Sequence, residues 1–62
     1  MTENVYYIES SITLTETLKT IKKNFSHCRV HAEPIEMNYM QVEIISKTED
    51  VKSIEKLLAP LM

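Results

Sequence analysis

Residues 27–46 read HCRVHAEPIEMNYMQVEIIS, and the alternation of their side chains decides the fold. In residues 27–33 the odd-numbered positions are polar and the even-numbered positions are apolar, and residues 39–46 show a longer apolar row at even-numbered positions. A period of two is typical of a strand that buries one face. Pro34 interrupts the first run, so we expect a hairpin of two strands over residues 27–33 and 39–46. The second strand is longer and more apolar, which predicts that it is central in the sheet.

A further strand and a helix are expected before this hairpin. The segment NVYYIE (residues 4–9) is aromatic and β-branched, which favours a strand. Thr13 and Glu16 have the spacing of a capping box and predict the start of a helix. The helix should end near Asn24 or Phe25. Its apolar stripe repeats at intervals of four, three and four residues: Leu14, Leu18, Ile21 and Phe25.

A second helix is expected after the hairpin. Thr48 is its predicted N-cap, acidic residues follow in the first turn, and Pro60 should end the regular helix near Ala59. The chain contains no glycine, so a turn that needs a positive φ is expected at an asparagine, Asn24 or Asn38.

The order strand, helix, strand, strand, helix over residues 1–62 predicts one small α+β domain. A right-handed crossover places the first helix on one sheet face, and the second helix should join it. The expected architecture is a two-layer sandwich with a three-stranded sheet in the order 1-3-2 and one open face. In element order it resembles the ferredoxin-like fold without its last strand, an architecture shared by ACT-type regulatory domains and RNA-recognition domains.

Composition argues against several classes of partner and cofactor. The net charge is -2 and the seven basic residues are scattered, so we expect no nucleic-acid partner. No apolar run approaches the ~20 residues of a membrane-spanning helix, so no membrane partner is expected. Without glycine there is no phosphate-binding loop or dinucleotide fingerprint, and no cofactor is expected. One unpaired cysteine agrees with a reducing, cytoplasmic location.

The cluster of His27, Cys28 and His31 is the only arrangement that resembles a metal or catalytic site. On a strand Cys28 would point away from both histidines, which would stand ~13 Å apart, too far for one zinc ion. We therefore expect no metal, a core thiol and no enzymatic activity. An enzyme assembled between two copies, with His27 or His31 as the base, remains a third hypothesis.

The predicted function is a small non-enzymatic interaction or regulatory module. We expect a protein partner to bind the open sheet face, where five predicted contact residues lie beside Glu43: Tyr7, Arg29, His31, Tyr39 and Gln41. The first strand should keep an unpaired edge that carries no lysine or proline, so we also expect a homodimer.

The alternative is a small-molecule-sensing, ACT-like regulatory domain. Its ligand site would lie at the dimer interface, where Ser10, Ser11 and Thr13 precede or begin a helix and present backbone N–H groups. The ACT-type resemblance implies a glycine near this loop, and this chain has none.

Overall fold

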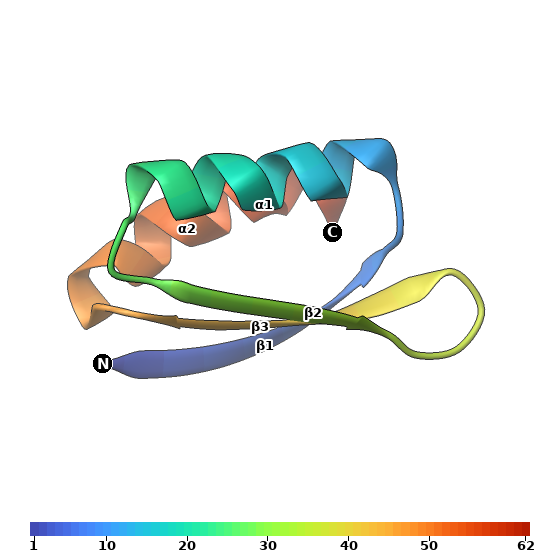
Figure 1. Cartoon of the computed structure of the whole chain (residues 1–62), viewed down its shortest axis with the longest axis horizontal. Coiled ribbons are helices and arrows are strands. Elements are labelled where there is room, and N and C mark those ends of the chain that lie inside the picture. The colour runs from blue at the N-terminus through green and yellow to red at the C-terminus, as the bar shows by residue number, and fades with distance from the viewer.

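The structure is a computed structural model that describes all 62 residues. Its two α-helices pack on one face of a three-stranded sheet (Figure 1), which confirms the predicted α+β fold. The elements, in chain order and including two short 3₁₀ segments, are β1 (Thr2–Glu9), α1 (Ile12–Asn24), β2 (Arg29–Pro34), β3 (Tyr39–Ser46), η1 (Thr48–Asp50), α2 (Val51–Leu58) and η2 (Ala59–Leu61).

The sheet has the predicted order β1-β3-β2, with β3 in the centre and antiparallel to both neighbours. Strand β1 pairs along its whole length, from Thr2 opposite Ser46 to Glu9 opposite Tyr39. Strands β1 and β2 are therefore parallel to each other but separated by β3. The order and the helices are those of a ferredoxin-like fold that lacks its last strand.

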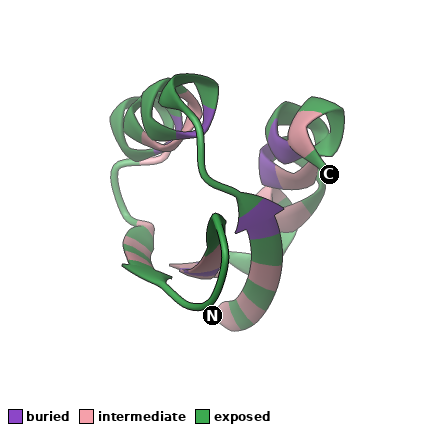
Figure 2. Ribbon diagram, turned by 90° about the vertical axis from the view of Figure 1, so that its right-hand side faces the viewer, coloured by how far each residue is buried: buried purple, intermediate pink, exposed green.

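The strand residues of the core are even-numbered, and they pack with residues of both helices. Figure 2 shows how burial alternates with exposure along β1. Burial of one large aliphatic side chain contributes about 1.5–3 kcal/mol, so these few residues dominate the stability. The core consists of seven fully buried apolar residues: Ile8, Leu14, Ile21, Val42, Ile44, Ile54 and Leu58. The predicted orientation of β1, with Ile8 toward the helices, is confirmed.

The two edges of the sheet differ in the backbone groups that they expose. The N–H of Ser10 donates to the carbonyl of Asn38, and the N–H of Ile35 donates to the carbonyl of Tyr39 at 3.0 Å. Hydrogen-bonded pairs alternate along antiparallel strands, so in β1 the odd-numbered residues direct their N–H and C=O groups away from β3. In β2 the even-numbered residues do so, and Pro34 among them has no N–H to offer.

The start of α1 differs from the prediction. Ser11 is the N-cap, with an extended backbone, and its hydroxyl accepts from the N–H of Leu14 at 3.0 Å. The capping box at Thr13 and Glu16 is wrong, because the capping hydroxyl comes two residues earlier and Thr13 already lies inside the helix. The predicted end is confirmed, since α1 stops at Asn24.

The region before α2 also departs from the prediction. A 3₁₀ turn starts at Thr48, whose side chain makes no capping hydrogen bond. Instead its hydroxyl lies 2.6 Å from the hydroxyl of Thr2 and links this turn to β1. Helix α2 ends at Leu58 and continues as 3₁₀ through Pro60, which confirms the predicted end of regular helix.

The residue with positive φ is Met37, at 59°, and the expectation of Asn24 or Asn38 is wrong. Asn24 completes the helix, and the carbonyl of Asn38 is already engaged by Ser10. The left-handed residue of the hairpin turn is Met37, one position before Asn38. Met37 is 90% exposed and unbranched at Cβ, so the side chain has room in this conformation.

Candidate functional site

No other part of the chain covers the sheet face opposite the helices, which we call the open face (Figure 1). It carries the odd-numbered residues of the three strands, all exposed or half-buried: Glu3, Val5, Tyr7, Glu9, Arg29, His31, Glu33, Tyr39, Gln41, Glu43 and Ile45. The five predicted contact residues thus share one surface. Their role in binding stays a prediction.

The strand register places the two tyrosines at one end of the open face. Tyr7 lies opposite Gln41, and Tyr39 lies opposite Glu9, so the tyrosines are diagonal neighbours on adjacent strands. Diagonal neighbours are about 7–8 Å apart, within reach of aromatic side chains. Tyr7 is 61% exposed and Tyr39 is 47% exposed, so both present ring surface to solvent.

Charged groups are spread over the open face, and negative charges dominate. The open face carries four glutamates and one arginine, and Arg29 forms no ion pair within the chain. His31 and Glu33 are paired through Nε2 and Oε2 at 3.2 Å. Both side chains are more than half exposed, so the pair contributes at most about 1 kcal/mol.

The sequence interpretation missed part of this surface. Val5 and Ile45 also lie on the open face, and the odd-numbered alternation of their strands was a sufficient signal to find them. In the hairpin turn, Ile35 and Met37 are also exposed apolar residues. Their exposure depends on the turn conformation, which sequence periodicity does not report.

The cluster around Cys28 is not arranged as the sequence suggested. Strand β2 begins at Arg29, so His27 and Cys28 lie in the connection before it, and the predicted strand start is wrong. The thiol donates weakly to the carbonyl of Ile21 at 3.9 Å and is partly buried against the core. No three histidine, cysteine or acidic side chains are grouped closely enough to hold a metal ion.

The environment of Cys28 disfavours its thiolate. Desolvation raises the pKa of the Cys28 thiol, although a backbone hydrogen bond and nearby Lys22 oppose the shift. The thiolate is the nucleophilic form, so a raised pKa weakens the residue as a nucleophile at neutral pH.

The three predicted ligand residues near α1 separate in the structure. Ser11 caps the helix, and Thr13 is exposed on its first turn. Only Ser10 lines a cavity, which has a volume of about 240 Å³. A shared ligand site of the three residues within one copy is therefore not formed.

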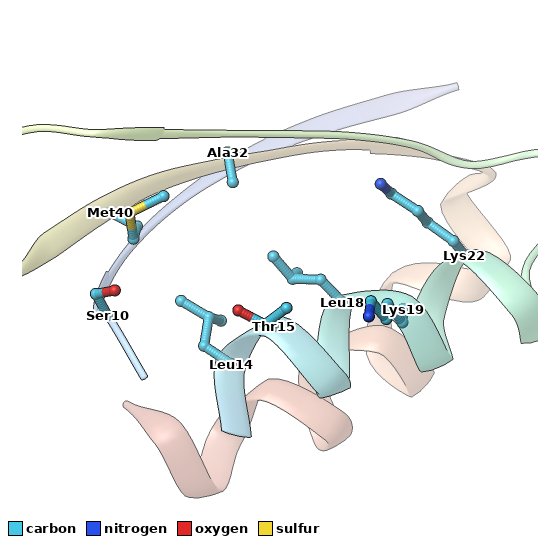
Figure 3. A pocket seen from close by; sticks show the side chains of 8 residues that line it. All are labelled: Ser10, Leu14, Thr15, Leu18, Lys19, Lys22, Ala32 and Met40. Carbon is cyan, nitrogen blue, oxygen red and sulfur yellow. The ribbon is translucent and has the colours of Figure 1, made fainter. Parts of the chain in front are cut away.

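This cavity lies between α1 and the β2–β3 hairpin, on the helix side of the sheet (Figure 3). The sequence interpretation missed it because its lining comes from four separate segments. The lining residues are Ser10, Leu14, Thr15, Leu18, Lys19, Lys22, Ala32 and Met40. None of them is acidic.

A hydrogen bond on the other side of the helix layer joins β1 to α2. The hydroxyl of Tyr6 donates to Oε2 of Glu55 at 2.9 Å. Desolvation, then the hydrogen bond and the charge of Glu55, raise the pKa of Tyr6 from 10.0 to about 12. Because the folded-state pKa of Tyr6 lies above that of the unfolded chain, its interaction contributes fully to stability below pH 10. This contribution is lost as pH rises toward 12.

We predict that Tyr6→Phe lowers the free energy of unfolding by about 1 kcal/mol at pH 8, because it removes one hydrogen bond. The difference from wild type should shrink as pH rises above 10. Urea unfolding of both proteins between pH 8 and 11.5 measures this. Glu55→Gln keeps an acceptor but removes its charge, so it should reduce the pH dependence only in part, because desolvation of Tyr6 is the largest cause of the shift, and it should not cause the full loss at pH 8. A Tyr6→Phe deficit that stayed constant across this range would contradict the assignment.

Comparison with models of protein families, with curated proteins and with solved structures found no significant match. A proposal for its function therefore rests on the fold and the side chains of this chain. None of its helices is long and apolar enough to cross a membrane.

Proposed function

We propose that the protein is a small non-enzymatic interaction module that forms a homodimer and binds a protein partner through the open face. One observation carries the proposal: on a face that nothing covers, exposed Tyr7 and Tyr39 gather at one end, and Arg29, which has no ion-pair partner, lies toward the other end. Tyrosine and arginine are enriched where protein interfaces concentrate their binding energy. The proposal includes a cytoplasmic location and requires no cofactor.

The charges of the open face favour a protein over nucleic acid. Nucleic-acid binding depends on clustered basic side chains that replace counterions on phosphates. Here the open face carries four glutamates and only one arginine, so a phosphate backbone would be repelled. A partner that presents basic and apolar groups fits better, with an acidic group positioned to reach Arg29.

The homodimer is supported by the free edge of β1. Four residues in β1 direct unpaired N–H and C=O groups outward, and the strand contains neither lysine nor proline to block pairing. The chain exposes 4490 Å², more than the about 4100 Å² expected from its mass for a compact monomer. Antiparallel pairing of two β1 edges would join the sheets into one of six strands.

Side-chain charges restrict the register of this pairing. Pairing centred on Tyr6 would set Glu3 directly opposite Glu9 of the second copy, and facing like charges destabilise a sheet. Pairing centred on Val5 sets Glu3 opposite Tyr7 and avoids this repulsion. We therefore propose the register in which Val5 faces Val5 of the second copy.

The open face is tested by partner capture with matched variants. If both residues are binding hot spots of the interface, Tyr39→Ala and Arg29→Ala should each weaken binding of the partner about 30-fold. Lys52→Ala, an exposed substitution on α2, is the control and should bind like wild type. Native mass spectrometry of protein isolated from its host identifies the partner, and titration then measures the affinities. Unchanged affinity in both open-face variants would reject this surface.

A second candidate function is sensing of a small molecule, as in an ACT-like regulatory domain. The cavity beside Ser10 favours it, since it provides a concave site next to the loop that joins β1 to α1. A metabolite that raises the melting temperature would support this candidate, because selective binding to the folded state stabilises that state.

A further inference from the structure

We propose that the cavity between α1 and the β2–β3 hairpin binds a small aliphatic carboxylate, with its chain between helix and sheet and its carboxylate at the lysines. The inference rests on the second candidate function and names the class of ligand. It is independent of the open face, because the cavity lies on the opposite side of the sheet.

The apolar wall defines the part of the ligand that is buried. Leu14 and Leu18 project from α1 toward Ala32 of β2 and Met40 of β3 (Figure 3). The small side chain of Ala32 leaves space in the sheet layer, and flexible Met40 can adapt to the shape of a chain. Aliphatic surface buried here would stabilise the complex through the hydrophobic effect.

The lysines define the charge of the ligand. Lys19 and Lys22 lie one turn apart on α1, and Lys22 extends from the helix toward the sheet (Figure 3). Neither ammonium group forms an ion pair within the chain, and the cavity lining contains no acidic side chain. An anion at this end would find two positive charges, whereas an amine would be repelled.

The size and the hydroxyl groups narrow the class further. A volume of about 240 Å³ is below the ~300 Å³ at which ordinary small-molecule pockets begin, so a nucleotide or a large cofactor does not fit. The hydroxyls of Ser10 and Thr15 add hydrogen-bonding groups to the lining. A single carboxylate with a short unbranched chain satisfies the charge, the apolar wall and the volume together.

The test uses octanoate as the probe and heteronuclear NMR of the intact chain as the measurement. Saturable shifts are expected at the amides and methyl groups of the cavity lining, with no shifts on the open face. Affinity should rise up to about fourfold for each methylene from butanoate to octanoate, because each buried methylene adds apolar contact. Octan-1-ol should bind more weakly than octanoate, and octylamine should bind most weakly.

Matched variants test the residues. Lys19→Gln and Lys22→Gln should each weaken octanoate binding about threefold and leave octanol binding unchanged. Lys52→Gln carries the same charge change on α2 and should have no effect on either ligand. Ala32→Leu should fill the cavity and abolish binding, and the NMR spectrum of this variant reports directly whether it is folded.

Three results would overturn the inference. They are no saturable shift with octanoate, equal binding of octanoate and octan-1-ol, or shifts confined to residues outside the cavity. If octanoate fails but another class of metabolite raises the melting temperature through this cavity, the sensing function stands and only the carboxylate assignment fails. Capture of a partner on the open face is unaffected by any of these outcomes.

Discussion

Ile44→Ala should remove about half or more of the stability of this protein. A chain of 62 residues is expected to have a free energy of unfolding of about 3–9 kcal/mol. Ile44 is 2% exposed in the centre of β3, and truncation of a buried isoleucine to alanine costs about 2–5 kcal/mol. Only seven apolar residues are fully buried, so the remaining core has little capacity to compensate.

Ile45→Ala is the matched control for this prediction. It is the same substitution in the adjacent position of the same strand, but Ile45 points to the open face and is only half-buried. We expect its cost to be less than half that of Ile44→Ala. Urea unfolding monitored by circular dichroism measures both values by linear extrapolation. Equal losses in the two variants would mean that the open face is covered in solution, as it would be in a dimer formed through that face.

Val5→Pro should convert the proposed dimer into a folded monomer. The N–H of Val5 points away from β3, so proline at this position removes no hydrogen bond within the sheet. It removes a donor from the free edge at the centre of the proposed dimer. Analytical ultracentrifugation should then show a mass near 7.2 kDa, with the circular dichroism spectrum of wild type.

Ala32→Pro provides the control for the general effect of proline in an edge strand. The N–H of Ala32 also points away from the sheet, but at the opposite edge on β2. This variant should remain dimeric. A second variant, Val5→Lys, blocks the β1 edge by charge without a backbone restriction, and should also be monomeric. A dimer that persists in both Val5 variants would show that β1 does not form the interface.

The sheet and its order were predictable because period-two alternation is strong in the hairpin strands. The apolar row of Met40, Val42 and Ile44 identified both the central strand and the buried face, and the structure confirms them. The helix starts were less predictable, because several hydroxyl side chains compete near each start. Ser11 rather than Thr13 caps α1, and a 3₁₀ turn replaces the predicted cap at Thr48.

The open face could be predicted for the same reason as the sheet, since alternation assigns every second residue to it. The cavity could not, because it forms where Ser10, one face of α1, Ala32 and Met40 meet. Leu14 and Leu18 read from the sequence as ordinary core positions, and Lys19 and Lys22 read as charges that favour the helix C-terminus. Only the packing of α1 against the hairpin shows that these side chains border a common space.

The separation of β1 from β2 by β3 has a consequence for the order of folding events. The β2–β3 hairpin closes through four residues, 35–38, and hairpins form in microseconds. Strand β1 instead pairs with β3, from which it is separated in the sequence by α1 and β2, and such non-local pairing slows folding. Until β1 docks, one side of β3 stays open and accepts residues 2–9 of any neighbouring molecule equally well. Refolding yield is therefore expected to depend on protein concentration, with strand exchange competing against correct docking when the chains are crowded.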